Sequence, residues 1–333
     1  PKWAKSNKAL LMKIINFKHQ EHIRVGALDG DTVVDFTALQ QAAPFLQPQH
    51  LSALGNTIEL IRAWDQLRPL LTVAIAKSKT VAACRVPLSG VDLQPPMIPS
   101  TILCSGSNYI SHNQEKANAD ISGKEPEFFI KTGDVVVGHG QPVVLDRVLT
   151  SKLDGEVELA AVIGKSGRHI AVEDALSHVF GYTIVNDMTA RDRQVRKRPD
   201  GSYWYELGRG KFFDGGAPMG PCITTADDIP DPQNIMVKSW VNGDLRQISS
   251  TSQMIWTVAQ LVHFFSINVT LKPGMVIITG TPSGTAWSCD AELGGKWHGT
   301  DGMVPATGYL KDGDEIICEI EGIGRLRNPV VEA

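Results

Sequence analysis

Short β-rich runs separated by turn residues make up most of this 333-residue chain, and they limit what it can fold into. Asp29-Gly30 and Asn242-Gly243 each lie between two such runs, where an Asp-Gly or Asn-Gly pair is typical of a β-hairpin. Apolar residues recur at helical spacing in residues 58–78 and 254–267, which predicts helices there. Because strands dominate and helices do not alternate with them, we expect an α+β fold on a curled sheet rather than a repeating βαβ array.

The composition is that of a globular protein. The chain is 42% hydrophobic and carries 36 acidic against 32 basic residues, for a formal net charge of −4. A disordered chain would have fewer apolar residues and a larger net charge. The mild acidity argues against a general nucleic-acid binder, and no apolar run approaches the ~18–20 residues of a membrane-spanning helix. We therefore expect neither a nucleic acid nor a membrane as partner.

The cysteines and the first residues bear on the cellular compartment. The five cysteines are odd in number and none belongs to a Cys-x-x-Cys pair, so the pattern favours a reducing cytoplasm over a disulfide framework. Residues 1–11 lack the long apolar core of a signal peptide, and Met12 resembles an alternative start. We interpret residues 1–11 as an N-terminal extension.

A proline-rich stretch divides the chain. Val86–Pro99 contains four prolines, a composition that predicts a linker. The length alone suggests about two domains. We therefore expect a small N-terminal domain plus linker over residues 12–97 and a larger domain over residues 98–333.

Two glutamates lie at the mouth of the apolar run Val157–Ile163. Glu156 and Glu158 are two residues apart, so on a strand they project to one face, ~6.5–7 Å apart. Left alone, the two carboxylates would repel each other, and burial would add a desolvation cost. A divalent cation between them resolves both problems, and oxygen ligands suit Mg²⁺ or Mn²⁺. The open alternative is a pair of glutamates on a solvated strand face.

A third carboxylate follows another apolar strand. Asp187 comes directly after Tyr182–Asn186. It is a candidate third ligand, but an Asp after a strand is also a common helix N-cap, and the residues alone favour the N-cap.

Eight segments, kept in order over about residues 100–330, together resemble the fumarylacetoacetate hydrolase superfamily. Each segment is weak alone, whereas eight in sequence are highly specific. They are Asp154–Leu159, Gly181–Asp187, Ala190–Gln194, Gly210–Asp214, Val241–Gly243, Thr251–Ile255, Thr279–Gly284 and Glu321–Gly324.

The resemblance implies a fold and a cofactor. It implies a catalytic domain that is a mixed β-sandwich roll, a small N-terminal α+β domain and usually a homodimer. It also implies one divalent metal, usually Mg²⁺ with Mn²⁺ or Ca²⁺ as alternatives, held by Glu156, Glu158 and Asp187. Three carboxylates leave open positions for water and a bidentate substrate.

The resemblance also points to an acid–base pair. Asn108–Ala119 reads as a helix, on which His112 and Glu115 are neighbours at i and i+3. A carboxylate beside an imidazole orients the ring and raises its basicity, as a base that activates water requires. An isolated His-x-x-Glu is otherwise a surface pair. In the family this segment is often a mobile lid.

Further residues match the family's catalytic and substrate contacts. Lys211 is implied to stabilise enolate charge, although alone it would read as a surface loop residue. Arg191 and Gln194 share a helical face, and Arg191 suits either carboxylate binding or a structural ion pair. Thr281 resembles a substrate-carboxylate contact, or simple turn chemistry. Tyr109, in the loop that leads into the predicted helix, is assigned to substrate binding.

The substrate class shared by the family is a 2-oxo acid with a second carbonyl at C4, an acylpyruvate. The resemblance implies a carbon–carbon bond hydrolase of aromatic catabolism, in which the His–Glu pair activates water and cleavage expels a metal-bound enolate of pyruvate. Alternatives on the same site are an oxaloacetate-type decarboxylase and an isomerase or hydratase of hydroxymuconate-like dienoic acids. A non-catalytic binding protein is disfavoured because all three metal ligands are present.

Two segments depart from the family's usual pattern. Residues 196–209 are long and aromatic, and residues 287–309 read as an insertion that carries Trp287, Trp297 and His298. The segments would line a pocket for a larger or cyclic substrate or brace a dimer, and both interpretations stay open.

Overall fold

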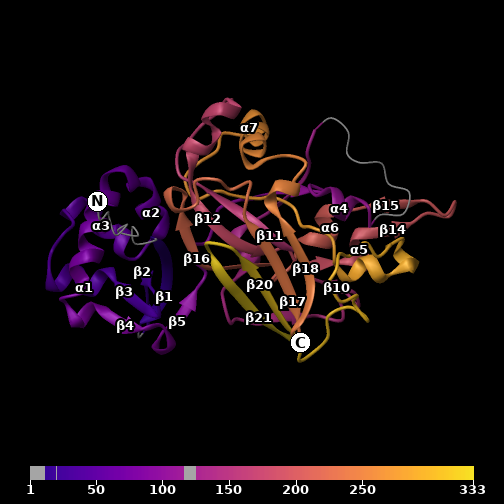
Figure 1. The fold of residues 1–333 in the computed structure, drawn as a ribbon, viewed down its shortest axis with the longest axis horizontal. Helices are drawn as coiled ribbons and strands as arrows, with labels where there is room; N and C mark the ends of the chain where they lie inside the picture. Colours follow the sequence, from indigo (N-terminus) through magenta and orange to yellow (C-terminus); the bar gives the residue numbers. More distant parts are fainter. Residues whose placement is uncertain (1–11, 20, 116–124) are drawn as a thin grey trace, which may run out of the picture.

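The computed structural model describes residues 12–19, 21–115 and 125–333 (Figure 1). Its α-helices are α1 (Phe36–Ala42), α2 (Thr57–Arg62), α3 (Trp64–Ser78), α4 (Ile110–Asn113), α5 (Arg191–Gln194), α6 (Leu207–Lys211) and α7 (Val258–Asn268). Its 3-10 helices are η1 (Pro48–Leu54), η2 (Ala82–Cys84), η3 (Leu88–Gly90), η4 (Gly133–Val135), η5 (Val172–His178), η6 (Ala226–Asp228), η7 (Thr251–Gln253), η8 (Ala286–Cys289) and η9 (Ala291–Leu293).

One large sheet runs through the described part of the chain. Its path is β4-β3-β2-β1-β16-β12-β11-β19-β6-β7, with β5 paired to β1 and β8 to β16. Neighbours on this path are antiparallel except β19 and β6, which are parallel. The strands are β1 (Lys13–His19), β2 (His22–Asp29), β3 (Thr32–Asp35), β4 (Arg85–Pro87), β5 (Asp92–Gln94), β6 (Ile102–Gly106), β7 (Glu127–Lys131), β8 (Val136–Val137), β11 (Val157–Ile163), β12 (Val179–Asn186), β16 (Ala217–Thr225) and β19 (Val276–Ile278).

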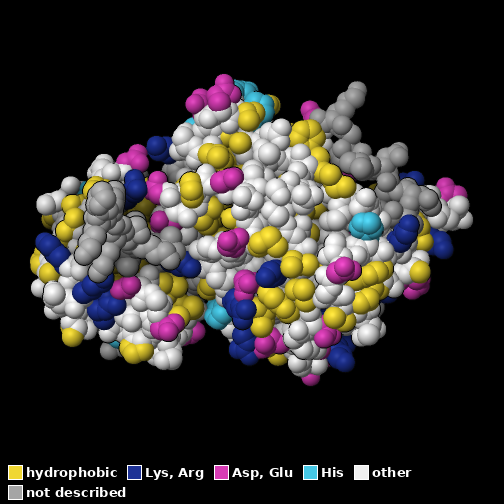
Figure 2. Space-filling view, in the orientation of Figure 1, with side chains coloured by type: hydrophobic (Ala, Val, Ile, Leu, Met, Phe, Trp, Pro, Cys, Tyr) yellow, Lys and Arg dark blue, Asp and Glu magenta, His cyan; other side chains and the backbone are white. Residues whose placement is uncertain are grey.

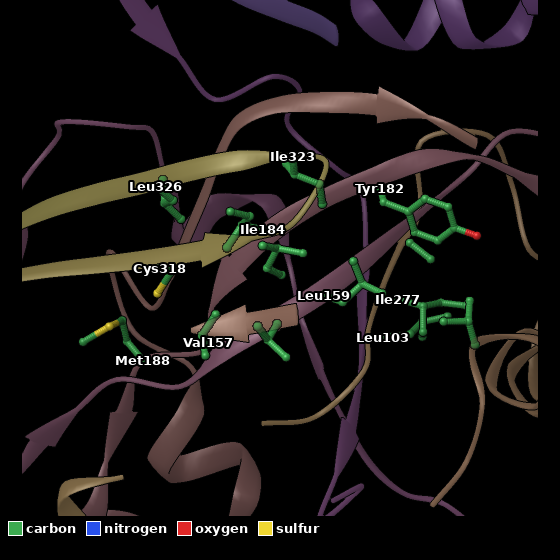
Figure 3. Packing of buried hydrophobic residues seen from close by; sticks show 14 of the residues in the cluster. Leu103, Val157, Leu159, Tyr182, Ile184, Met188, Ile277, Cys318, Ile323 and Leu326 are labelled. Carbon is green, nitrogen blue, oxygen red and sulfur yellow. The ribbon is translucent and has the colours of Figure 1, made fainter. Parts of the chain in front are cut away.

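A second sheet packs against the middle of the large one, which confirms the predicted mixed α+β fold. Its order is β18-β17-β20-β21-β9. Cys318 and Leu326 of this sheet share one buried hydrophobic cluster with Val157 and Ile184 of the large sheet (Figure 3). The strands are β9 (Val143–Leu145), β17 (Met236–Val241), β18 (Asp244–Ser250), β20 (Glu315–Ile320) and β21 (Gly324–Glu332). Two small pairs stand apart, β10 (Leu153–Asp154) with β13 (Thr189–Ala190) and β14 (Val195–Lys197) with β15 (Tyr203–Tyr205).

The N-terminal strands are continuous with the large sheet. β1 pairs with β2 on one side and with β16 on the other, where Ile14 lies opposite Ile223. A second hydrophobic cluster joins Phe36 and Leu60 of the N-terminal helices to Val162 of β11. The N-terminal part, at one end of the molecule in Figure 1, therefore shares a core with the rest. The division at residues 97 and 98 stays a prediction.

The predicted helix over residues 254–267 begins later than its apolar spacing indicates. Its helical turns start at Val258. Thr257 caps the helix: its side chain accepts a hydrogen bond from the backbone N–H of Gln260, and the Gln260 side chain accepts one from the Thr257 N–H. This reciprocal pair satisfies two backbone donors at the first turn and fixes the helix start there.

The helix expected over residues 108–119 is short. α4 ends at Asn113, and Glu115 lies in the turn that follows. Residues 116–119 lie outside the described residues. Within the described residues, no helix is both long and apolar enough to cross a membrane.

Candidate active site

Three carboxylates meet where β11 and β12 lie side by side. Glu156 directly precedes β11, Glu158 is its second residue and Asp187 directly follows β12. The two strands are antiparallel with Val157 opposite Asn186, and the Asp187 N–H donates to the Glu156 carbonyl over 2.8 Å. One oxygen of each carboxylate lies within 4.8 Å of the others, and all three residues are buried. The strand pairing therefore brings together the three predicted metal ligands.

Glu158 is the carboxylate whose charge is least compensated. Burial, and then the negative charges of Asp187 and Glu156, raise the pKa of Glu158 well above its usual value. Its Oε2 accepts a hydrogen bond of 2.7 Å from the Gly280 N–H, which offsets only part of this effect. A positive charge close to Glu158 would therefore stabilise its ionised form.

Lys211 supplies part of the compensating charge. Its Nζ lies 2.6 Å from Glu156 Oε2 and 2.6 Å from Asp187 Oδ2. Although burial alone would raise the pKa of Glu156, the charges of Lys211 and Arg191 lower it well below its usual value. Lys211 itself is buried at the end of α6, so it is not the surface loop residue that its glycine-rich surroundings allow.

A second lysine, Lys131, lies at the same carboxylates and was not predicted. Its Nζ lies 2.5 Å from Asp187 Oδ1 and donates to the carbonyls of Gly216 and Met188. Lys131 ends β7, where it is fully buried and in phase with the buried Phe129. Residues i and i+2 of a strand face the same side, so the sequence could have indicated the burial of Lys131 from its position two residues after Phe129.

The residues present fit a divalent metal. The donors are carboxylate oxygens, which hard cations such as Mg²⁺ and Mn²⁺ prefer. The pKa of Glu158 is raised by burial and by the negative charges of Asp187 and Glu156, and a bound cation would neutralise that excess negative charge. Glu156, Glu158 and Asp187 would hold the metal.

Arg191 is occupied by contacts within the protein. Its Nε donates to Asp154 Oδ2 over 2.8 Å, its Nη1 donates to Gln194 Oε1 over 2.9 Å, and its Nη2 lies 2.6 Å from Glu156 Oε1. The side chain is 1% exposed. Arg191 and Lys211 thus hold opposite oxygens of Glu156, which fixes the orientation of that carboxylate.

His112 and Glu115 form a hydrogen-bonded pair. His112 Nδ1 lies 2.7 Å from Glu115 Oε2, while Glu115 Oε1 accepts a hydrogen bond of 2.7 Å from the Gly284 N–H. Burial raises the pKa of Glu115, and its contact with His112 acts in the opposite direction. With Nδ1 engaged by Glu115, Nε2 is the imidazole nitrogen available to a ligand.

A cavity of about 310 Å³ joins these groups. That volume lies at the small end of the range for ligand pockets. Of the predicted residues, its wall includes His112, Glu156, Glu158, Asp187, Arg191, Gln194, Lys211 and Thr281. Glu115 contacts His112 without lining the cavity. The acid–base pair and the carboxylate triad therefore face one small ligand-sized space.

Two predicted substrate contacts have other partners in this structure. Thr281 Oγ1 donates to the Val157 carbonyl over 3.0 Å and accepts from Gln247 Nε2 over 2.8 Å, so it braces the start of β11 as well as lining the cavity. Tyr109 is fully buried in the hydrophobic cluster and pairs through its backbone with Met254, outside the cavity lining. The assigned substrate contact of Tyr109 stays a prediction.

Both segments that depart from the family's pattern reach the cavity. Tyr205, in β15, and Trp287, in η8, lie on its wall. Their rings are 6.1 Å apart at 84°, an edge-to-face contact. The two segments therefore build one side of the pocket together.

Residues 101–331 match the family model described as fumarylacetoacetate (FAA) hydrolase C-terminal. The chain belongs to the fumarylacetoacetate hydrolase family. This family membership agrees with the resemblance drawn from the eight sequence segments.

Relatives of known structure or name extend over nearly the whole chain. Oxaloacetate tautomerase fahd2, mitochondrial, of Xenopus laevis is 34% identical over 329 residues, covering 97% of this chain and 91% of its own. Oxaloacetate tautomerase YisK of Bacillus subtilis is 39% identical over 282 residues, covering 83% and 86%. The crystal structure of maleylpyruvate hydrolase from Sphingobium sp. SYK-6, in complex with manganese(II) and pyruvate, superposes with a TM-score of 0.70 at 32% identity, covering 97% and 100%.

Proposed function

We propose that the chain is a divalent-metal-dependent enzyme that interconverts the keto and enol forms of oxaloacetate or a closely similar 2-oxo acid. The observation that carries the proposal is the His112–Glu115 pair lining the same small cavity as the Glu156, Glu158 and Asp187 triad. Two relatives that cover most of the chain are named oxaloacetate tautomerases, which supports oxaloacetate over an acylpyruvate as the first substrate to test.

The residues of the chain supply a proton relay. Glu156, Glu158 and Asp187 would hold the metal, which when bound would supply a Lewis acid for the oxygens of the 2-oxo acid. Glu115 accepts a hydrogen bond from Nδ1–H of the His112 imidazole, so that Nε2 carries no proton and takes one from C3 of the substrate. The same nitrogen returns that proton in the reverse reaction. The ammonium of Lys211, beside the triad, stabilises negative charge that develops on the C2 oxygen. That oxygen then takes a proton from solvent to complete the enol, and it loses this proton again in the reverse reaction.

Enol absorbance of oxaloacetate tests the proposal directly. We expect ketonisation to exceed the rate of a protein-free control with the same Mg²⁺ or Mn²⁺, and to fall to that control with EDTA or in Glu158→Gln. His112→Asn should keep metal binding by calorimetry and lose the rate enhancement. Full turnover in EDTA, or in His112→Asn, would contradict the proposal.

The second candidate is the acylpyruvate hydrolase expected from the sequence, supported by the similarity to a maleylpyruvate hydrolase. In this reaction His112 Nε2 takes a proton from water, the oxygen adds to C4, the C3–C4 bond breaks and C3 receives the proton. Products are pyruvate and a carboxylic acid. Release of pyruvate from acylpyruvates favours hydrolysis, release of pyruvate from oxaloacetate favours decarboxylation, and enol conversion without pyruvate favours tautomerisation.

We also propose that the chain forms a homodimer through the outer face of the sheet β18-β17-β20-β21-β9. Figure 2 shows hydrophobic side chains gathered in this part of the surface. Trp240 of β17 lies opposite Ile317 of β20, and both are half-buried, out of phase with the buried Ile316 and Cys318. Light scattering should give twice the chain mass for the wild type and the single mass for Trp240→Glu. Val148→Glu, at a residue 94% exposed, is the control.

The cellular compartment is a further proposal. All five cysteines are free thiols, and four of them are buried. We propose a reducing compartment, as expected of the cytoplasm. Fractionation of the native host with antibody against the chain tests this.

A further inference from the structure

Trp287 stands between the two halves of the candidate site. It is 2% exposed and belongs to η8, within the insertion at residues 287–309. Its ring centroid lies 6.0 Å from that of His112, with the planes at 71°. The guanidinium of Arg191, which holds Glu156, lies 5.6 Å from the Trp287 ring. One indole therefore contacts both the acid–base pair and the support of the carboxylate triad.

The backbone of Trp287 is fixed to the carboxylate that also fixes Arg191. The N–H groups of Ala286 and Trp287 each donate to Asp154 over 3.0 Å, and Arg191 Nε donates to the same Asp154 side chain. The indole Nε1 donates to the Leu293 carbonyl over 3.1 Å. Asp154 lies two residues before Glu156, so the position of the indole is tied to that of the triad.

The segment that carries Trp287 also contacts Glu115, the partner of His112. The Gly284 N–H donates to Glu115 Oε1, and the Lys296 N–H donates to the Glu115 carbonyl over 2.8 Å. α4, which carries His112, is only four residues long. A helix that short does not hold its shape without tertiary contacts. Residues 284–296 therefore supply contacts that α4 lacks.

We propose that Trp287 is a positioning residue, whose indole sets the orientation of the His112 imidazole relative to the carboxylate triad. The inference rests on the proposed function in assigning proton transfer to His112. An edge-to-face contact restrains a ring in both distance and tilt. Misplacement of a reacting group by about 1 Å can cost 10²-fold in rate. Trp287 acts through His112 and is not itself assigned a bond to the substrate.

The test compares Trp287→Phe with Trp287→Leu in the metal-loaded enzyme. Phe keeps an aromatic ring against His112, whereas Leu does not. We expect Trp287→Leu to lower kcat about 10–100-fold, with KM for oxaloacetate and Kd for Mg²⁺ within about twofold of the wild type. Trp287→Phe should keep most of kcat. The acid limb of the kcat–pH profile should shift in Trp287→Leu and should match the wild type in Trp287→Phe.

Trp64→Leu is the matched control. Trp64 makes an edge-to-face contact with Phe180, 4.9 Å between centroids, outside the cavity lining. We expect this variant to lower the melting temperature while keeping kcat. Equal losses of kcat in the Phe and Leu variants of Trp287, a rise in KM alone, or an unchanged kcat in Leu would overturn the proposal.

A second measurement separates this inference from the proposed function. Diethyl pyrocarbonate modifies accessible imidazole nitrogens, and mass spectrometry reads its reaction at His112, which is 7% exposed. We expect faster modification of His112 in Trp287→Leu than in the wild type or Trp287→Phe, whether or not oxaloacetate is a substrate. Equal modification in all three proteins would overturn the positioning role, while a wild type inactive on every 2-oxo acid would overturn only the function.

Discussion

Lys211 Nζ lies 2.6 Å from Glu156 Oε2, at the centre of a buried group of carboxylates. Arg191 holds the other oxygen of Glu156, so this carboxylate is ionised with two cationic partners. Glu158, two residues away, has its pKa raised by burial and by neighbouring carboxylates. Two glutamates on one strand edge thus have pKa shifts of opposite sign, and such divergence marks different chemical roles. Glu156 is an anion before any metal binds, whereas Glu158 is the carboxylate whose ionisation a bound cation would favour.

Replacing Lys211 by Met should separate stability from metal binding. Without the ammonium, Glu156 and Asp187 lose a buried partner, so we expect the metal-free protein to lose about 3 kcal/mol of unfolding free energy. Mg²⁺ should bind more tightly, because it no longer competes with the lysine charge, while kcat falls about 10²-fold. Urea unfolding in EDTA measures the loss of unfolding free energy, and urea unfolding in Mg²⁺ measures the change in metal affinity. Lys165→Met, at an exposed lysine 3.8 Å from Asp65, should change neither.

Metal affinity should increase with pH through the raised pKa of Glu158. Below that pKa the carboxyl holds a proton that the cation must displace, so each metal ion bound releases a proton. Calorimetry in two buffers of different ionisation enthalpy counts the protons released. Glu158→Gln should bind the metal weakly and without this release. A Kd independent of pH across the neutral range would show that Glu158 is ionised before the metal arrives.

The same group makes the metal-free protein less stable as the pH rises above the usual pKa of a glutamate. In the unfolded chain Glu158 ionises near its usual value of 4.5, whereas in the folded chain it keeps its proton to higher pH. The contribution of Glu158 to the free energy of unfolding is therefore fully present below its pKa in the unfolded chain. It is lost as the pH rises through its pKa in the folded chain. The melting temperature measured in EDTA should decrease across that pH range, and Mg²⁺ should abolish the decrease. Unchanged pH dependence in Glu158→Gln would assign it to other groups.

The sequence placed Glu156 and Glu158 at the edge of a buried strand, where apolar spacing is informative. The residues alone favoured a helix N-cap for Asp187, and only the family resemblance assigned it as the third metal ligand. Lys131 was missed because a lysine at a strand end normally lies in solvent, and only its phase with Phe129 indicated burial. Trp287 was noted as part of an insertion, but its contact with His112 depends on tertiary packing across more than 170 residues, which no local pattern encodes. Thr257 and Gln260, three residues apart, form the sequence pattern of a capping box, and this pattern would have predicted that α7 starts at Val258.

Gly284 should tolerate no side chain. Its φ is +110°, and an added Cβ would lie 1.9 Å from the Arg246 carbonyl oxygen. We expect Gly284→Ala to destabilise the fold by more than the ~1–2 kcal/mol of a left-handed residue alone, and to lower kcat because the Gly284 N–H would no longer hold Glu115. Gly302 has a φ of +88° and open space around it, so Gly302→Ala measures the cost of the positive φ without a clash. Similar melting temperatures for the two variants would contradict the predicted clash.

Arg191→Lys decides between the two roles predicted for Arg191. A lysine keeps the charge but cannot hold Asp154, Glu156 and Gln194 at once, because it lacks the planar fork of donors. If Arg191 orients Glu156, Kd for Mg²⁺ should rise about tenfold, as for loss of other groups that orient metal ligands, and KM measured at saturating Mg²⁺ should stay near the wild-type value. If Arg191 binds a substrate carboxylate, KM should rise while Kd for Mg²⁺ stays constant. Since Nε, Nη1 and Nη2 of Arg191 all contact protein groups, we expect the first result. Gln194→Leu should reproduce it more weakly through its single contact with Nη1.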